Sequence, residues 1–171
     1  MLKKVVWFTG MSGVGKTTIS DRLLEVLKKK NYKATQIDGD RFRKKKSYKN
    51  NFSKKTIILN NINIINYADR IKNNYDFILV SAISPILKTR LIAKKKFKEN
   101  YFEIYVFCNF ETLRKRDTKG LYKKADLNII NNLIGYKSKI DYEKSNFRKT
   151  LINTDKLNIS ECLIKIIKKI L

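Results

Sequence analysis

Short runs of apolar residues alternate along the chain with longer segments in which apolar residues recur at a helical period. The short runs are rich in β-branched and aromatic side chains, which favour buried strands. They predict strands at residues 5–9, 32–37, 77–82, 102–107 and 149–153. The intervening segments predict helices at residues 17–27, 57–71, 86–97, 110–116 and 159–171.

Strands that alternate with helices imply a parallel sheet covered by helices on both faces. We therefore expect an α/β fold, a three-layer sandwich with a mainly parallel β-sheet between helices. No internal repeat and no linker rich in proline, glycine or serine divides the chain, so we expect one domain over residues 1–171. Ligands of such sheets bind beyond the carboxyl ends of the strands. The residues that follow predicted strands there, and should converge on one crevice, are Gly10, Asp38, Ser84 and Cys108.

The first predicted strand leads into residues 10–17, which complete the phosphate-binding pattern G-x-x-x-x-G-K-[ST]. Its glycines allow backbone N–H groups to wrap phosphates, and the N-terminus of the next helix adds partial positive charge. Lys16 should reach the β- and γ-phosphates, and the hydroxyl of Thr17 should hold Mg²⁺. A chance glycine-rich turn is the alternative, but it does not account for a complete match between a strand and a helix. We expect ATP and Mg²⁺ as cofactors, with ATP bound by Gly10, Ser12, Gly13, Val14, Gly15, Lys16, Thr17 and Thr18.

The composition adds a formal net charge of +24 and no histidine, so a general base must be a carboxylate, a lysine or a water. The basic residues are spread through the chain, which favours solvated helix faces and anionic small substrates over nucleic acid. No apolar run approaches the roughly 20 residues that span a bilayer, and no signal-peptide pattern opens the chain. The two cysteines lack a metal-binding spacing. We expect a reduced, cytoplasmic enzyme without a membrane partner.

Two carboxylates, Asp38 and Asp40, flank a glycine at the end of the second predicted strand and face the phosphate loop. Phosphoryl transfer needs a charge clamp, Mg²⁺ and a group that orients or deprotonates the attacking hydroxyl. Either aspartate can do the last task, and Arg43 can bind an anionic acceptor through two hydrogen bonds. The alternative is a tight turn, because Asp-Gly is a common hairpin signal. We expect Asp38, Asp40 and Lys16 to be catalytic.

A charged segment with a glycine hinge follows the fourth predicted strand. We expect a mobile lid at about residues 114–140 that closes over the phosphates and excludes water. The alternative is a solvated basic loop. Within this segment, Arg114 and Arg116 are expected to bind ATP.

Several motifs occur in the order and nearly the spacing of the adenylylsulfate kinase family, and the chain resembles that family over nearly its whole length. They are residues 6–18, Asp38-Gly39-Asp40, Phe52-Ser53, Ile83-Ser84-Pro85 and the especially specific residues 116–125. The resemblance implies a P-loop kinase fold and usually a homodimer. It also implies transfer of the γ-phosphate of MgATP to the 3′-hydroxyl of adenosine 5′-phosphosulfate.

The resemblance also assigns roles to individual residues. Asp38 and Asp40 match a pair of which one is the base, and Phe52 matches an aromatic stacked on the acceptor base. Lys119 matches a lid lysine near the anionic end of the acceptor. The acceptor-binding set that we expect is Asp38, Asp40, Arg43, Phe52, Asn60, Ile83, Ser84, Lys119, Gly120, Leu121 and Leu133.

Departures from the family pattern fall on the acceptor side. Ile57 replaces an acceptor-binding arginine, and Leu133 stands where the second aromatic of the base clamp is expected. Arg41 replaces an asparagine, and Ile86-Leu87 replaces an aromatic residue followed by arginine. A stacked base contributes roughly 1–3 kcal/mol, so these changes indicate the same chemistry on a different acceptor.

The acceptor that this pattern favours is cytidine diphosphoramidate, the substrate of a related kinase of capsule biosynthesis, because a pyrimidine presents less stacking area than adenine. The first alternative is adenylylsulfate itself, as in sulfate assimilation. A kinase for a small hydroxylated metabolite and an ATP-dependent nucleic-acid-binding protein are more distant alternatives.

Overall fold

The structure, a computed structural model, describes residues 3–44, 52–145, 147 and 150–171. Its strands are β1 (Lys4–Thr9), β2 (Ala34–Asp38), β3 (Phe77–Ser81), β4 (Tyr101–Phe107) and β5 (Thr150–Asn153). Its α-helices are α1 (Lys16–Lys29), α2 (Gly39–Lys44), α3 (Lys54–Ile71), α4 (Leu87–Phe97), α5 (Phe110–Arg116), α6 (Leu121–Asp126) and α7 (Ile159–Ile170). Two 3₁₀ turns, η1 (Lys72–Asn74) and η2 (Lys98–Asn100), precede β3 and β4. Residue 149, the expected start of the last strand, lies outside the described residues.

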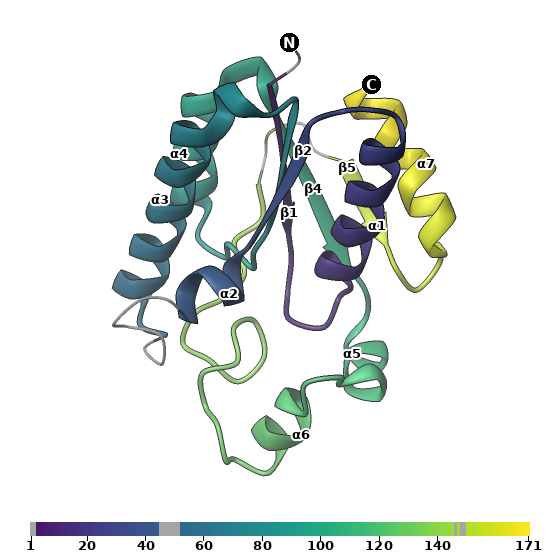
Figure 1. Cartoon of the computed structure of the whole chain (residues 1–171). Helices are drawn as coiled ribbons and strands as arrows, with labels where there is room; N and C mark the ends of the chain where they lie inside the picture. The colour runs from purple at the N-terminus through teal and green to yellow at the C-terminus, as the bar shows by residue number, and fades with distance from the viewer. Residues whose placement is uncertain (1–2, 45–51, 146, 148–149) are drawn as a thin grey trace.

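The five strands form one sheet in the order β2-β3-β1-β4-β5, and every neighbouring pair is parallel. Helices α1 and α7 pack together on one face, and α3 and α4 pack together on the other (Figure 1). This arrangement confirms the expected three-layer α/β sandwich. It places β1, and the loop that follows it, in the middle of the molecule.

Alternating side chains of β1 explain why both faces of the sheet are covered. Val6 and Phe8 join the apolar core beneath α1 and α7, whereas Val5 and Trp7 join the core beneath α3 and α4. All four side chains are buried. A central parallel strand must be apolar on both faces, and the continuous apolar run at residues 5–8 meets that requirement.

Helix α2 corrects the alternative of a hairpin turn at Asp38-Gly39. Instead of turning back, the chain begins a short helix, and the Asp38 carboxylate caps it by accepting a hydrogen bond from the backbone N–H of Arg41, 2.9 Å away. Glycine is required here for close packing, because a Cβ at Gly39 would lie 2.8 Å from the Cβ of Ala82. The helix holds Asp40 at the carboxyl edge of the sheet.

Helix α6 was not expected from the apolar pattern. It begins after Gly120, whose φ of 62° is left-handed, and the Asp117 carboxylate accepts hydrogen bonds from the backbone N–H groups of Tyr122 and Lys123. The negative charge of an acidic side chain at this end also interacts favourably with the helix dipole.

Across the described residues, none of the helices is long and apolar enough to cross a bilayer.

Candidate active site

The phosphate loop connects β1 to α1 at the carboxyl edge of the sheet (Figure 1). Gly10, Gly13 and Gly15 adopt φ angles of 141°, 81° and 95°, which side chains other than glycine rarely tolerate. A Cβ at Gly10 would lie 2.0 Å from the carbonyl oxygen of Val106, so the loop also needs glycine for its approach to β4. All three glycines therefore permit a backbone conformation that a side chain would disfavour, and Gly10 also permits a close contact that a side chain would prevent.

The Lys16 ammonium lies inside this loop. Its Nζ donates hydrogen bonds to the carbonyl oxygens of Gly10 at 2.9 Å and Met11 at 2.7 Å. Burial lowers the pKa of Lys16 to about 8, against the opposing effect of the Asp40 carboxylate. A buried, pre-oriented cation of this kind is well placed to bind an anionic phosphate.

The two predicted carboxylates occupy different environments. Asp38 accepts a hydrogen bond from the hydroxyl of Thr17 at 3.2 Å, while its second oxygen caps α2. Asp40 instead accepts a hydrogen bond from Lys119 Nζ at 2.7 Å. Burial would raise the pKa of Asp40, but the hydrogen bond and charge of Lys119, together with the charge of Lys16, lower it overall. The charges facing Asp40 thus keep it ionised across the cleft from the phosphate loop.

A hydrogen bond anchors the segment expected to form a lid to the phosphate loop. Tyr122 is buried, and its hydroxyl donates a hydrogen bond of 2.8 Å to the carbonyl oxygen of Ser12. Arg116 reaches the opposite wall, where its guanidinium donates to the hydroxyl of Thr154 at 2.9 Å and to the carbonyl oxygen of that residue at 2.7 Å. The contacts of Arg116 and Tyr122 therefore hold the intervening residues beside the cleft, which Lys119 lines.

A smaller pocket opens beside α2 and α3. The guanidinium of Arg43 lies 4.9 Å from the centre of the Phe52 ring, a cation–π distance. Asn60 is buried at the wall, and its side-chain oxygen has no hydrogen-bond partner within the described residues. Ile57 and Ile134 complete an aliphatic side of the pocket. The pocket therefore combines an arginine stacked on a phenylalanine ring, a side-chain oxygen without a hydrogen-bond partner among the described residues, and an apolar wall.

Most predicted site residues meet in one cleft of about 1940 Å³. This volume exceeds the roughly 300–1,000 Å³ of a typical small-molecule site. The predicted residues that line the cleft are Ser12, Gly13, Val14, Gly15, Lys16, Thr17, Thr18, Asp38, Asp40, Arg43, Phe52, Ile83, Arg116, Lys119, Leu121 and Leu133.

Five predicted residues lie elsewhere. Asn60 and Ser84 line the smaller pocket, and Gly10 contributes its carbonyl oxygen beneath the loop. Arg114 points to Asp126, with which it forms an ion pair of 3.0 Å, and it does not line the cleft. Gly120 serves as the left-handed residue before α6.

Sequence reasoning missed one wall of the cleft, the loop from β5 to α7. Thr154, Asp155, Lys156 and Leu157 line the cleft beside the phosphate loop, and the Thr154 hydroxyl donates to the carbonyl oxygen of Val14 at 3.2 Å. The signal was available, because residues that follow the last parallel strand must emerge at the same edge as the other ligand-binding loops.

Comparisons with known proteins agree with this geometry. A family profile described as Adenylylsulphate kinase matches residues 3–149. The probable adenylyl-sulfate kinase of Archaeoglobus fulgidus is 35% identical over 152 residues, which cover 89% of this chain and 96% of that protein. The adenylyl-sulfate kinase of Synechococcus sp. is 34% identical over 158 residues, covering 92% of this chain and 88% of that protein.

Among solved structures, the Mycobacterium tuberculosis APS kinase CysC in complex with AMPPNP and APS aligns with a TM-score of 0.85 and 28% identity. The alignment covers 96% of this chain and 95% of that one. The likeness therefore includes the sheet, both helical layers and the segment over the cleft.

These findings correct the acceptor that the sequence favoured. Cytidine diphosphoramidate is wrong as the preferred substrate, because the family profile and the relatives above are adenylyl-sulfate kinases. Two of the departures that suggested it, Ile57 and Ile86, pack with Ile134 in one buried aliphatic cluster. The chain belongs to the adenylylsulphate kinase family of phosphotransferases.

Proposed function

We propose that this protein is an adenylylsulfate kinase that transfers the γ-phosphate of MgATP to the ribose 3′-hydroxyl of adenylylsulfate. The observation that carries the proposal is the position of Asp40, which lines both the large cleft and the smaller pocket. It is the one acidic residue of the described chain that lines the smaller pocket. An attacking hydroxyl and a γ-phosphate must meet at such a junction.

The phosphate-loop half of the cleft suits MgATP. The loop offers backbone N–H groups and the Lys16 ammonium to the phosphates. The Thr17 hydroxyl and the Asp38 carboxylate, 3.2 Å apart, are the oxygen ligands that Mg²⁺ prefers, and Mg²⁺ commonly takes its remaining ligands from phosphates and water. A Mg²⁺ ion held by these two side chains would neutralise charge that develops on the transferred phosphate. The loop from β5 to α7 and Arg116, which donates to the carbonyl oxygen of Thr154 in that loop, form a wall of the cleft against which the nucleoside of ATP can bind.

The part of the large cleft beside the smaller pocket suits the acceptor nucleotide, and the smaller pocket itself, at about 40 Å³, has room for only a small part of that ligand. Phe52 offers a ring face to a base, and Arg43 beside it carries positive charge toward the 5′-phosphosulfate or the base. The unpartnered oxygen of Asn60 is an acceptor for a ligand N–H group. We propose that these three side chains select a nucleotide over a simple alcohol.

Asp40 and Lys16 then divide the chemistry. Asp40 accepts the proton of the 3′-hydroxyl while the hydroxyl oxygen forms a bond to the γ-phosphorus. The bond between that phosphorus and the β–γ bridging oxygen breaks, which releases ADP. Lys16 stabilises negative charge on the phosphoryl oxygens. In this structure Lys119 donates to one oxygen of the Asp40 carboxylate, Oδ2. Asp38, held by Thr17 and by the cap of α2, stays on the metal side.

The test is acceptor-dependent release of ADP by the purified chain. With MgATP, adenylylsulfate should accelerate ADP release, whereas AMP, which lacks the sulfate, should do so far less. The Lys16→Ala variant measures the background of contaminating kinases. Equal rates with and without adenylylsulfate would overturn the proposal.

We further propose that the protein acts as a homodimer in the cytoplasm, as the family resemblance implies. Sedimentation velocity tests the assembly: a single species near twice 20.2 kDa is expected, and a species near 20.2 kDa at micromolar concentration would contradict it.

A further inference from the structure

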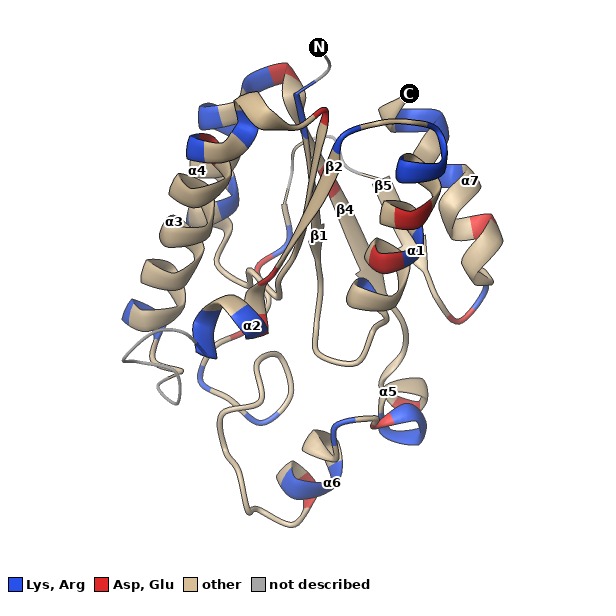
Figure 2. Cartoon of the chain, viewed as in Figure 1, with Lys and Arg blue, Asp and Glu red and all other residues tan. Residues whose placement is uncertain are grey.

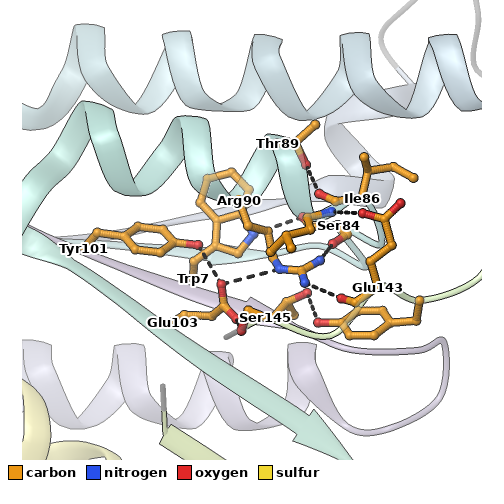
Figure 3. Close-up of polar contacts among 12 residues, drawn as sticks. Trp7, Ser84, Ile86, Thr89, Arg90, Tyr101, Glu103, Glu143 and Ser145 are labelled. Atoms are coloured by element: carbon orange, nitrogen blue, oxygen red, sulfur yellow. Dashed lines mark hydrogen bonds and ion pairs between the residues drawn. The ribbon is translucent and has the colours of Figure 1, made fainter. Parts of the chain in front are cut away.

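A buried arginine connects the smaller pocket, called the acceptor pocket from here on, to residues 142–145, which follow the proposed lid. Figure 3 shows the polar contacts of Arg90, which lies on α4. Its side chain is completely buried. Its guanidinium donates to the carbonyl oxygen of Ser84, in the loop after β3, and to the carbonyl oxygen of Glu143. It also forms an ion pair with Glu103 of β4, with 3.4 Å between Nε and Oε2. One side chain therefore joins three segments that are distant in sequence.

The loop that Arg90 holds is conformationally unusual. Ser84 has a φ of 46°, in the left-handed region that a residue with a Cβ rarely occupies. Its hydroxyl accepts a hydrogen bond from Trp7 Nε1 at 3.0 Å (Figure 3). The same hydroxyl donates one to Asn61 Oδ1 at 2.6 Å. Backbone strain of this kind persists where the surroundings fix it, and it concentrates at ligand sites. Ser84 and its neighbours Ile83 and Pro85 line the acceptor pocket.

The segment on the far side of Arg90 is tied to the same loop. The backbone N–H of Glu143 donates to the carbonyl oxygen of Pro85 at 3.0 Å, and the Glu143 carboxylate accepts from the N–H of Leu87 at 2.6 Å. The Tyr142 ring lies 5.0 Å from the Arg90 guanidinium carbon, and its hydroxyl is 2.8 Å from that of Thr9 at the end of β1. Residues 83–87 and 142–145 thus form one unit at the base of the acceptor pocket.

A buried ion pair is a weak source of stability, because apolar side chains of the same volume are often as stabilising. Its advantage is geometric, since the flat guanidinium fork directs several N–H groups at once, which lysine cannot reproduce. We propose that Arg90 is a positioning residue for acceptor binding: it holds the loop at Ile83–Pro85 in the shape that receives the acceptor nucleotide and locks it to the segment after the lid. This inference rests on the proposed function for the identity of the acceptor.

The test compares Arg90→Lys with the matched surface variant Arg22→Lys, whose side chain is exposed on α1. The dissociation constant of adenylylsulfate, measured calorimetrically with AMPPNP present, should rise about tenfold in Arg90→Lys, the change that roughly one lost hydrogen bond produces. The dissociation constant of AMPPNP alone should change less than about twofold, because distant sites act independently. Arg22→Lys should change neither. Equal weakening of both ligands, or of neither, would overturn the inference.

Hydrogen exchange of the ligand-free protein separates this inference from the proposed function. In Arg90→Lys, amides of residues 81–89 and 140–145 should exchange faster, while those of β1 and α1 should keep their rates. Faster exchange throughout, or none in these two segments, would refute positioning even if the acceptor were a different nucleotide. A wild-type protein inactive on adenylylsulfate would refute the proposed function alone.

Glu103→Gln gives a second route if Arg90→Lys does not fold. Glu103 is buried on β4 and lines neither the cleft nor the pocket. Its neutral isostere weakens the anchor of Arg90 without touching a ligand. We expect the same selective loss of adenylylsulfate affinity, smaller than in Arg90→Lys, with AMPPNP affinity retained. Equal loss of both affinities would contradict the proposal.

Discussion

The two halves of the cleft are built in opposite ways. The phosphate-loop half depends on backbone geometry, in which Gly10 and Gly15 permit the fold of the loop and Lys16 is held by its carbonyl oxygens. The half proposed for the acceptor depends on side-chain packing, in which Ile57 and Ile134 line the smaller pocket and belong to one aliphatic cluster with Ile86. Backbone geometry tolerates few sequences, whereas side chains can be exchanged together. The motif is complete where backbone geometry constrains the loop, and it departs from the family pattern at Ile57 and Ile86, where side chains pack together.

Positive charge on the helix surfaces differs from positive charge at the cleft. Lys and Arg cover many surface positions of the helices, including α2 and the last turns of α1 (Figure 2). At the cleft, individual cations have defined partners: Lys16 with the phosphate loop, and Lys119 with Asp40. The net charge of +24 therefore describes the surface, while the site depends on a few placed groups.

The largest effect should come from breaking the phosphate-loop half. Lys16→Ala removes the buried cation that contacts Gly10 and Met11. Loss of one preorganised charge-stabilising group lowers kcat about 10²–10³-fold, and we expect the upper end because the group also binds ATP. Initial rates with saturating adenylylsulfate measure it. Binding of adenylylsulfate alone should survive, and its loss would show that the halves are not separable.

Removing the proposed base should have the next largest effect. Asp40→Asn keeps the shape but cannot accept the proton, and general-base catalysis contributes about 10²–10⁴-fold. We expect kcat to fall by about 10²-fold with little change in ATP affinity, since the transition state of phosphoryl transfer requires limited deprotonation. Asp38→Asn is the comparison: its activity should depend more steeply on Mg²⁺ concentration. The reverse pattern would exchange the two roles.

The aliphatic cluster can be tested by truncation. Ile57→Ala opens a cavity in a fully buried position, which lowers the free energy of unfolding by about 2–5 kcal/mol. Because Ile57 also lines the acceptor pocket, KM for adenylylsulfate should rise while KM for MgATP stays constant. Ile64→Ala is the matched control, equally buried on α3 but away from the pocket. If both variants change the acceptor KM alike, the cluster has no selective role.

The smallest effect concerns the contact across the cleft. Lys119 lowers the pKa of Asp40, so Lys119→Met should raise that pKa toward its ordinary value. A base with a raised pKa becomes protonated at a higher pH as the solution is acidified. The acidic limb of kcat/KM should therefore move to higher pH. Lys124→Met, an exposed lid substitution, should leave the limb in place, and a shift in both would point to general surface charge.

Much of the fold could be predicted because its strands are continuous apolar runs. Residues 77–81 are buried throughout β3, and β1 is nearly so, so their pattern matched the structure closely. Helices α2 and α6 could not be found this way. Each has only six residues, too few to show a repeating helical period, and each is capped by an aspartate a few residues upstream rather than marked by an apolar face.

The site was predictable where chemistry fixes spacing and less so where packing decides. The phosphate loop and the Asp38-Gly39-Asp40 motif led directly to residues that line the cleft. The meaning of Ile57 did not follow, because its partners Ile86 and Ile134 are distant in sequence and meet only in the folded chain. Arg90 carried no sequence signal at all, since an arginine in a basic helix resembles its solvated neighbours.

Transfer with adenylylsulfate and its 3′-deoxy analogue tests the central claim that Asp40 joins the two halves at the acceptor 3′-hydroxyl. The purified chain is incubated with MgATP and either compound, and the product is identified by phosphorus NMR and mass spectrometry. Adenylylsulfate should yield a single 3′-phosphorylated product with one equivalent of ADP, and the analogue should yield none. Phosphorylation of the analogue, or ADP release without a phosphorylated product, would contradict the account.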